Sequence, residues 1–240
     1  RNTSHPEEYF QINTELTKRL FDHFLQSSAR DFIYFSSVKA VADTVQGVLD
    51  ESATPNPQTP YGQSKWQAEQ YLNSQPLPEG KRLFILRPCM IHGPGNKGNL
   101  NLLYNMVKTG IPYPLAAFEN RRSFLSIDNL QFVVKWLIKN PDIPGGTYNL
   151  ADDEALSTNE LIRIIGEARG RRTRLWRLSP NLIKGIARLG DTFKLPLNSE
   201  RLKKLTENYI VDNSKIMDAL KIAHMPVSAR EGLLKTLRSF

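Results

Sequence analysis

Phe32-Ile33-Tyr34-Phe35 and Leu83-Phe84-Ile85-Leu86 are two short apolar runs, and a helical segment that starts at Thr59-Pro60 lies between them. Runs of four apolar residues between polar segments are typical of buried strands. Threonine at the N-cap and proline in the first turn favour a helix that begins here and continues to about Asn73. A strand, a helix and a second strand joined by short links predict a parallel sheet flanked by helices. This stretch therefore predicts an α/β fold.

The segment before the first apolar run predicts an amphipathic helix over residues 7–28, because apolar side chains recur there at helical spacing. The stripe that we expect this helix to bury consists of Tyr9, Ile12, Leu16, Leu20 and Phe24. Residues 43–60, between the first apolar run and the central helix, are polar and rich in proline, which indicates a surface loop.

Beyond Arg87 the sequence continues as short strands and helices. His92-Gly93-Pro94-Gly95 indicates a turn-rich loop, and residues 124–127 predict a strand. Asp128 is the expected cap of a helix over 129–139. The remaining expected elements are a strand at 148–150 and helices at 102–107, 157–168, 179–190, 212–221 and 228–239.

Composition narrows the function classes. The 240 residues are 40% apolar and 23% charged, which is normal for a globular protein. No apolar run reaches the roughly 18 residues that span a bilayer, so we expect no membrane partner. The histidines lack the spacing of metal ligands, so we expect no metal. A single cysteine, Cys89, cannot form an internal disulfide, which agrees with a reducing cytoplasm.

The net charge of +8 indicates either a generally basic surface or a field that attracts an anionic ligand such as a nucleotide diphosphate. Basic residues are scattered, and the one dense run, at 169–174, has no interleaved aromatic residues. We therefore interpret this run as a solvated loop and expect no nucleic-acid partner.

The clearest chemical signal is Tyr61-Gly62-Gln63-Ser64-Lys65 in the central helix. Tyr61 and Lys65 are four residues apart, so their side chains share a helix face. A phenol loses its proton near pH 10, and a nearby ammonium lowers that pKa. The pair can therefore exchange a proton with a substrate near neutral pH. By itself this spacing is weak, because it also occurs by chance in many helices.

Ser36 and Ser37 strengthen the signal, because they follow the first predicted strand. The carboxyl ends of parallel strands are where open α/β sheets bind ligands. A hydroxyl at Ser37 can hydrogen-bond the same substrate oxygen that Tyr61 addresses. For Ser36 the simpler interpretation is a serine that satisfies local backbone groups.

Taken together, these motifs resemble the extended short-chain dehydrogenase/reductases of the NAD-dependent epimerase/dehydratase family. The resemblance rests on Phe-Ile-Tyr-Phe-Ser-Ser at 32–37, on 61–65 with Ala68-Glu69, and on Leu86-Arg87-Pro88 followed by 92–95. It covers nearly the whole chain and is strongest toward bacterial UDP-sugar 4-epimerase-like proteins of surface-polysaccharide clusters. It implies a doubly wound (Rossmann) parallel sheet with a smaller, mostly helical substrate lobe. We expect residues 1–93 plus 124–150 to form the first part and 94–123 plus 151–240 the lobe.

The resemblance also implies roles for individual residues. Ser37, Tyr61 and Lys65 are the expected catalytic residues, acting around the nicotinamide of NAD, with NADP as the alternative. The residues expected to bind the cofactor are Asn13, Ser36, Tyr61, Lys65 and Pro88. The residues expected to bind a UDP-sugar substrate are Met90, Asn99 and Arg122, and Arg121 is the neighbour of Arg122. A homodimer is a further expectation.

Two departures from the family pattern stand out. The glycine-rich turn that cradles the cofactor pyrophosphate is absent, because Gly93-Pro94-Gly95 lies in the wrong place and contains proline. We therefore expect that roughly 80–90 residues with the first strands precede this chain, and that the 240 residues alone are inactive. Met90 and His92 stand where many epimerases carry other residues, which leaves the choice of sugar open.

Four functions remain open. A 4-epimerase oxidises the sugar 4-hydroxyl and returns the hydride to the other face, whereas a 4-ketoreductase performs only the second half and consumes NADH or NADPH. A 4,6-dehydratase is weaker, because Ser37-Val38-Lys39 supplies no carboxylates. A non-catalytic binding relative is the fourth, and the intact set of Ser37, Tyr61 and Lys65 argues against it.

Overall fold

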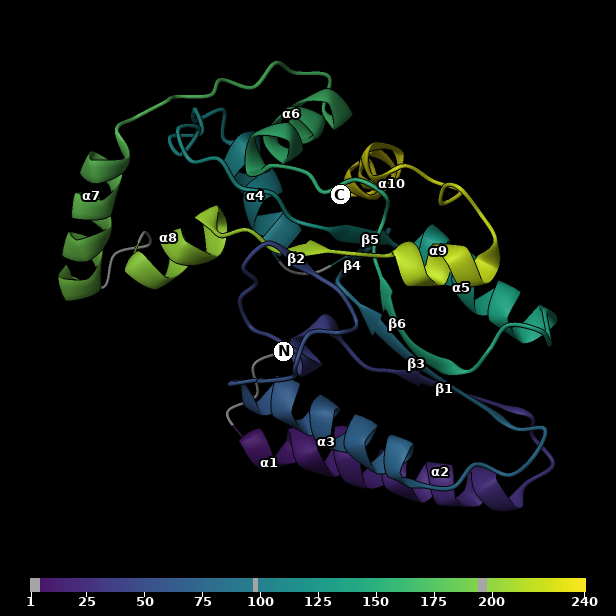
Figure 1. Ribbon diagram of the computed structural model, residues 1–240. Helices are drawn as coiled ribbons and strands as arrows, with labels where there is room; N and C mark the ends of the chain where they lie inside the picture. The colour runs from purple at the N-terminus through teal and green to yellow at the C-terminus, as the bar shows by residue number, and fades with distance from the viewer. Residues whose placement is uncertain (1–4, 97–98, 194–197) are drawn as a thin grey trace.

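A computed structural model describes residues 5–96, 99–193 and 198–240, apart from the side chains of Asn99, Phe193 and Lys204 (Figure 1). Its centre is a parallel sheet of β1 (Asp31–Phe35), β3 (Arg82–Pro88) and β6 (Gly146–Leu150), in the order β1-β3-β6. Phe32 pairs with Leu83 and Phe35 with Leu86, so the two quoted runs are adjacent strands. The predicted α/β class with a parallel sheet is confirmed.

One face of the sheet is covered by two long helices that lie side by side (Figure 1). The first consists of α1 (Pro6–Tyr9), a π-helical turn η1 (Phe10–Glu15) and α2 (Leu16–Gln26), and the second is α3 (Pro60–Ser74). Successive strand residues point to opposite faces, so Tyr34 and Ile85 pack with Phe21 and Leu72 on this side.

The buried stripe of the first helix differs from the predicted one. Ile12, Leu16 and Leu20 are 62%, 47% and 53% exposed, and the buried residues are Thr14, Thr17, Phe21 and Phe24. Apolar spacing identified the helix correctly but not the face that it buries. The reason is that Thr14 turns inward to bond α3, and the π-helical turn breaks the regular helical repeat.

The opposite face of the sheet is covered by α5 (Ile127–Lys139) and α9 (Ser214–Leu220). Phe84, Leu86 and Leu150 of the sheet pack there against Leu137 and Ile216. Helix α9 thus lies on the sheet, although the predicted division of the chain places it in the lobe. That division into two parts otherwise stays a prediction.

The helical lobe lies beyond the carboxyl ends of the strands (Figure 1). Its helices are α4 (Asn99–Lys108), α6 (Thr158–Ala168), α7 (Pro180–Phe193), α8 (Ser199–Thr206) and α10 (Ala229–Leu237). They share a separate apolar core, which includes Leu100, Tyr113, Ile165, Ile183 and Leu233. All but α8 were predicted from periodicity.

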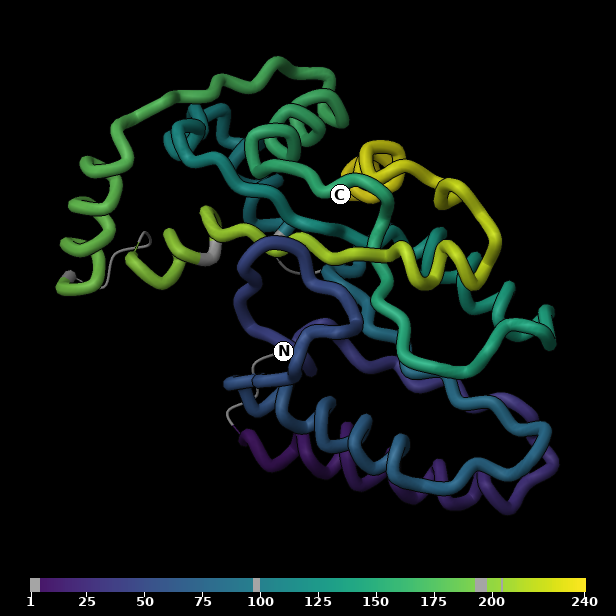
Figure 2. Tube along the Cα trace, viewed as in Figure 1, coloured from purple at the N-terminus to yellow at the C-terminus, as the bar shows by residue number. Residues whose placement is uncertain are grey.

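Two small parallel sheets connect the lobe to the central sheet. One pairs β4 (Met90–His92) with β5 (Phe124–Ser126), and the other pairs β2 (Val48–Leu49) with β7 (Ile210–Val211). Figure 2 shows the loop after β1 rising to meet the segment that carries β7. Strands β2 and β7 were not predicted, since two-residue strands have no detectable period.

Two local predictions were wrong. Helix α5 is capped by Ser126, whose side chain accepts a hydrogen bond from the backbone of Asn129, whereas Asp128 lies in the first turn and pairs with Lys235. His92 is the buried last residue of β4 rather than part of a loop. Its Nδ1 lies 2.9 Å from the hydroxyl oxygen of Thr236, so His92 is part of the core and not a substrate contact.

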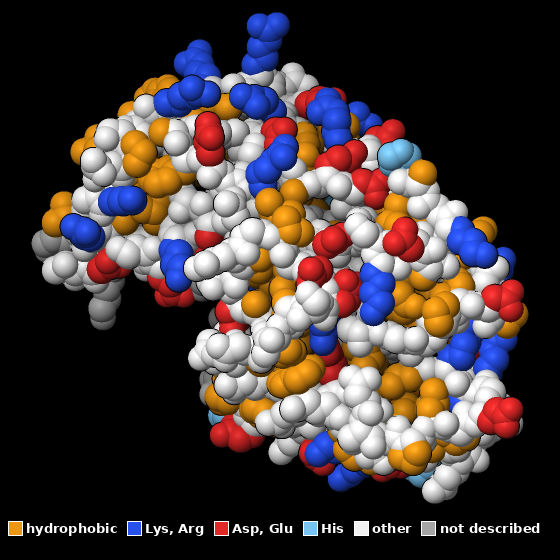
Figure 3. Space-filling view, viewed as in Figure 1, with side chains coloured by type: hydrophobic (Ala, Val, Ile, Leu, Met, Phe, Trp, Pro, Cys, Tyr) orange, Lys and Arg blue, Asp and Glu red, His pale blue; other side chains and the backbone are white. Residues whose placement is uncertain are grey.

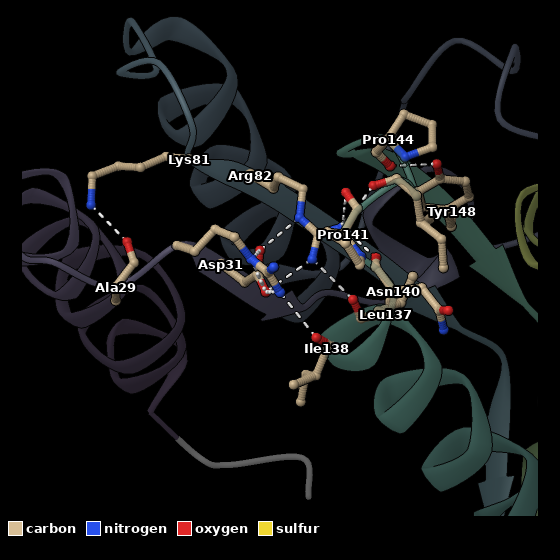
Figure 4. Close-up of polar contacts among 12 residues, drawn as sticks. Ala29, Asp31, Lys81, Arg82, Leu137, Ile138, Asn140, Pro141, Pro144 and Tyr148 are labelled. Atoms are coloured by element: carbon tan, nitrogen blue, oxygen red, sulfur yellow. Dashed lines mark hydrogen bonds and ion pairs between the residues drawn. The ribbon is translucent and has the colours of Figure 1, made fainter.

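Arg82 connects β1, β3 and the end of α5 at the amino-terminal ends of the strands (Figure 4). Its guanidinium donates to both carboxylate oxygens of Asp31, at 2.7 and 3.0 Å. It also donates to the Leu137 carbonyl in the last turn of α5. Three further acceptors follow this helix, namely the carbonyls of Asn140, Pro141 and Ile143. These carbonyls have no partner within the helix, so one side chain closes a helix end and joins two strands.

Within the described parts of the chain, no helix is both long enough and apolar enough to cross a membrane.

Candidate active site

Ser36 and Ser37 lie at the carboxyl end of β1 and point in different directions. Ser36 is buried and donates its hydroxyl to the carboxylate of Glu69, which is fully buried in α3. Arg87 completes this group, with Nη2 2.5 Å from Glu69 Oε2. The hydroxyl of Ser36 is therefore committed to the core, and a cofactor contact by this residue stays a prediction.

Ser37 instead faces the start of α3, because the two segments approach each other unusually closely at Gly62. A Cβ on Gly62 would lie 2.4 Å from the carbonyl oxygen of Lys39. Only glycine permits that approach. The Ser37 hydroxyl consequently lies close enough to Tyr61, the neighbour of Gly62, to lower the pKa of its phenol. Thr59 caps this helix as predicted, since its hydroxyl accepts from Gly62 N at 3.3 Å.

The predicted effect of Lys65 on Tyr61 is not what the structure shows. Burial raises the pKa of Tyr61, and the Ser37 hydroxyl lowers it only in part. The ammonium of Lys65 donates to the carbonyl of Phe35 at 2.8 Å. Two residues four apart share a helix face, but flexible side chains on that face need not meet. In this state Ser37, rather than Lys65, promotes deprotonation of Tyr61.

The ammonium of Lys65 loses its proton at a lower pH than that of an ordinary lysine. Burial lowers the pKa of Lys65 to about 8, and the nearby carboxylate of Glu69 counteracts part of that shift. Its Nζ also lies 5.0 Å from the centre of the Tyr34 ring. One donor is occupied by Phe35, so the ammonium keeps further donors for hydroxyl groups of a ligand.

Asn13 lies in the π-helical turn η1 and contacts α3. Its Nδ2 donates to the Ser64 hydroxyl at 3.0 Å, and that hydroxyl donates to the carbonyl of Tyr61 at 2.8 Å. The Thr14 hydroxyl donates to the Ser64 carbonyl at 2.8 Å. The turn therefore fixes the part of α3 that carries Tyr61 and Lys65. Asn13 supports this part of α3, and its contact with a cofactor stays a prediction.

A cavity of about 700 Å³ brings together four of the predicted residues, namely Ser37, Tyr61, Met90 and Arg122. It opens where the outline of the molecule is indented between α8 and the start of α3 (Figure 3). The lining residues that sequence reasoning missed include Tyr9, Lys39, Lys203, Glu207 and Tyr209. Tyr209 lies 148 positions after Tyr61, so no local pattern could have joined them.

Arg122 enters the cavity from the segment before β5. Its Nη2 lies 3.1 Å from Glu207 Oε1, and its buried Nε has no partner among the described residues. Burial lowers the pKa of Arg122, while Glu207 counteracts the shift. A buried guanidinium with an unused donor suits a ligand with paired acidic oxygens. Arg121, by contrast, is exposed.

Asn13, Ser36, Lys65 and Pro88 were also predicted but do not line the cavity. Pro88 is buried at the end of β3. Asn99 begins α4, but its side chain lies outside the described residues, so its role stays a prediction.

Known proteins resemble this chain along nearly all its length. It is 29% identical to the UDP-glucose 4-epimerase of Vibrio cholerae, over 97% of this chain and 70% of that protein. It is 26% identical to the N-acetyl-alpha-D-glucosaminyl-diphospho-ditrans,octacis-undecaprenol 4-epimerase of Escherichia coli O157:H7, over 96% of this chain and 71% of that one.

Solved structures show the same fold. The UDP-glucuronic acid 4-epimerase of Bacillus cereus, solved in complex with NAD, superimposes with a TM-score of 0.72 at 19% identity. The match covers 99% of this chain and 70% of that one. The family model for the NAD dependent epimerase/dehydratase family matches residues 1–151. With the Ser37, Tyr61 and Lys65 arrangement and this fold, the resemblance predicted from the sequence is confirmed: the chain belongs to the NAD dependent epimerase/dehydratase family.

Proposed function

We propose that this protein is an NAD-dependent UDP-sugar 4-epimerase of the cytoplasm. The observation that carries the proposal is the single cavity that Ser37, Tyr61 and Arg122 line together. A proton-transfer group and a guanidinium suited to phosphates on one cavity match the sugar and the diphosphate of a nucleotide sugar. The relatives in Vibrio cholerae and Bacillus cereus, both named as UDP-sugar 4-epimerases, support this substrate class.

The donor set of the site fits a nicotinamide dinucleotide. Lys65 and Tyr61 offer hydroxyl-binding groups at the carboxyl end of β1, where open parallel sheets bind dinucleotides. When bound, NAD supplies the chemistry of hydride acceptance from the sugar carbon and hydride return to it.

The residues of the chain supply the proton transfer and the binding. In the proposal Tyr61 Oη takes the proton of the 4-hydroxyl as the ketone forms and gives it back when the hydroxyl is restored. Ser37 donates a hydrogen bond to the same oxygen and steadies the developing charge. Lys65 donates to ligand hydroxyls with the N–H groups that the Phe35 carbonyl does not use. Met90, Asn99 and Arg122 bind the nucleotide sugar, with Arg122 at the diphosphate.

Incubation of the intact protein with UDP-glucose and catalytic NAD tests the reaction class. An epimerase forms UDP-galactose without net change in NADH, because the hydride returns to the sugar. The competing 4-ketoreductase would instead consume one NADH or NADPH for each product. Binding of UDP-sugar and NAD without any product would favour a non-catalytic relative.

The decisive variant is Tyr61→Phe, which keeps the ring and removes the acid/base oxygen. We expect turnover to fall by about 10²–10⁴, the usual contribution of a positioned proton-transfer group. Ser37→Ala should reduce turnover less, since it removes a hydrogen bond and not the proton carrier. Circular dichroism and UDP binding serve as controls for folding. Wild-type turnover in Tyr61→Phe would exclude this mechanism.

A second candidate acts on a lipid-linked substrate. The relative from Escherichia coli O157:H7 is named as a 4-epimerase of a polyprenyl-diphosphate sugar, and it aligns with 96% of this chain. Arg122 suits a diphosphate whatever group follows it. Parallel assays with UDP-N-acetylglucosamine and with polyprenyl-diphosphate N-acetylglucosamine separate the candidates by which substrate is converted.

We also propose that the protein is a homodimer that pairs through the exposed side of its first helix. The support is the stripe of Ile12, Leu16 and Leu20, which this chain leaves exposed.

A further inference from the structure

The connection between α6 and α7 carries an unbalanced group of positive charges. Arg171, Arg172, Arg174 and Arg177 lie within seven residues and are all exposed. Within the described parts of the chain, none of these side chains forms an ion pair or a hydrogen bond. Figure 3 shows Lys and Arg side chains standing out along the top rim, over this connection in Figure 1. Uncompensated like charges at such density favour an anionic partner.

Three of these arginines line a hollow whose shape is fixed by backbone bonds. Arg171, Arg172 and Arg174 surround a cavity of about 320 Å³ together with Tyr113 and the backbone around Gly110. The backbone of Tyr113 donates to the Arg174 carbonyl at 2.9 Å, and that of Trp176 to the Tyr113 carbonyl at 2.8 Å. The three arginines thus border a preformed space. Guanidinium forks match the geometry of phosphate oxygens.

Exposed apolar side chains accompany the arginines. Trp176 on the connection is 54% exposed, and Ile111 at the hollow is 64% exposed. On α7, Leu182, Ile186 and Leu189 are 55%, 40% and 58% exposed. Their spacing places these three on one side of the helix, next to the face through which Ile183 and Ala187 enter the core. Helix α7 stands at the edge of the molecule (Figure 1).

We propose that the connection and α7 form a docking surface for an anionic phospholipid bilayer. In this proposal Arg171, Arg172, Arg174 and Arg177 meet the phosphate headgroups, Trp176 lies at the interface, and the α7 stripe enters the acyl boundary. Arginines combined with a tryptophan and an exposed leucine stripe are typical of peripheral membrane surfaces. A nucleic acid would use the arginines but would leave the leucine stripe exposed to water.

This proposal departs from the expectation, drawn from the sequence, that the chain has no membrane partner. That expectation rested on the lack of a long apolar run, which bears on spanning and not on peripheral docking. The sequence also suggested a solvated loop at 169–174. Only the fold shows that this run and the stripe of α7 share one rim. The proposal does not depend on the epimerase reaction.

The test is sedimentation of the intact protein with vesicles, without any nucleotide sugar. We expect binding to vesicles of phosphatidylglycerol mixed with phosphatidylcholine and little binding to phosphatidylcholine alone. The double variant Arg172→Glu with Arg174→Glu should weaken binding by about 30-fold or more, because each basic side chain contributes roughly a factor of five at an anionic surface. Leu182→Ser with Leu189→Ser should weaken it as well.

Matched variants on α5 provide the controls. Lys135→Glu with Lys139→Glu makes the same change in net charge on exposed residues, and Ile138→Ser removes a side chain that is 51% exposed. Both should bind vesicles like the wild type. Circular dichroism of every variant checks folding. Equal losses in the control and the arginine variants would overturn the proposal, since net charge alone would then explain binding.

Two further outcomes would also overturn it. One is equal affinity of the wild type for neutral and anionic vesicles. The other is binding of single-stranded or duplex nucleic acid that depends on Arg172 and Arg174 while vesicles do not bind. Free inorganic phosphate is added in a separate arm. If it protects the arginines from chemical modification but vesicles do not bind, the hollow serves a small anion and not a membrane.

Discussion

At the scale of single residues, Arg122 illustrates how a candidate binding group is held in place by a neighbouring side chain. Its guanidinium is partly neutralised by Glu207 at 3.1 Å, and its Nε remains without a partner among the described residues. An arriving diphosphate would compete with the Glu207 carboxylate for the same guanidinium. The residue that attracts the proposed ligand is therefore restrained by a neighbour of the same charge as that ligand.

This geometry predicts that two substitutions have opposite effects on UDP binding. Arg122→Ala should weaken UDP binding by roughly 1.5–3 kcal/mol, the range for hydrogen bonds to charged groups. Glu207→Gln should strengthen UDP binding, because it removes the competing negative charge. Isothermal titration calorimetry on the intact protein measures both. Arg121→Ala is the control, since Arg121 is exposed and should leave affinity unchanged. An unchanged affinity in Arg122→Ala would move the diphosphate site elsewhere.

At the scale of elements, the first helix has two chemically distinct sides. Its inner side carries Thr14 and Asn13, which bond Ser64 and so hold the start of α3 beside Ser37. A π-helical turn at this position shifts the side chains relative to a regular helix, as such turns often do at functional sites. Its outer side carries the exposed apolar stripe.

The exposed stripe provides a test of the proposed homodimer. Replacing Leu16 and Leu20 with glutamate should shift the protein toward monomer. Burial of a leucine at an interface contributes roughly 1.5–3 kcal/mol, so loss of two should weaken association by about 100-fold or more. Size-exclusion chromatography with light scattering reports the mass. Ile138→Glu on α5 is a control of similar exposure. A wild type that is monomeric at high concentration would refute the dimer.

At the scale of the whole molecule, stability depends on a group of polar side chains at the amino-terminal ends of the strands, far from the candidate active site. Arg82 joins β1, β3 and the end of α5, with its side chain 11% exposed and that of Asp31 13% exposed. Burial by itself raises the pKa of Asp31, but hydrogen bonds from Arg82 and Arg30 outweigh burial and hold that pKa below its ordinary value.

Arg82→Met should lower the free energy of unfolding by about 3–5 kcal/mol, because it leaves several carbonyls without a partner and the Asp31 carboxylate with Arg30 alone. Asp31 has a lower pKa in the folded state than in the unfolded state. Its stabilising contribution is therefore complete above about pH 4 and is lost as the pH falls through the folded-state pKa. The difference between wild type and variant should consequently narrow in acid.

Urea denaturation of both proteins at neutral pH and near pH 3 measures this difference. Arg30→Met is the matched control, because Arg30 bonds the same carboxylate from a more exposed position and should contribute much less to stability. A gap between wild type and Arg82→Met that stays constant with pH would show that Asp31 titration makes no contribution.

The sequence determined the strands at 32–35 and 83–86 and most of the helices, and it singled out Tyr61 and Lys65 as candidates for proton transfer. These features are local: apolar periodicity, a threonine cap with a proline, and the spacing of Tyr61 and Lys65 are set by neighbours along the chain. The family resemblance followed from the same short motifs. The local pattern failed at the start of α5, where it predicted Asp128 as the helix cap and the structure has Ser126 as the cap.

Only the tertiary structure decided which side of a helix is buried and where flexible side chains point. Ile12, Leu16 and Leu20 have the spacing of a core stripe but remain exposed, because Thr14 and the π-helical turn bring the other side to α3. Lys65 bonds the end of β1 instead of approaching Tyr61. Glu207 and Tyr209 reach the cavity from a distant segment. Such contacts depend on packing between segments far apart in the chain, for which the sequence carries no local period.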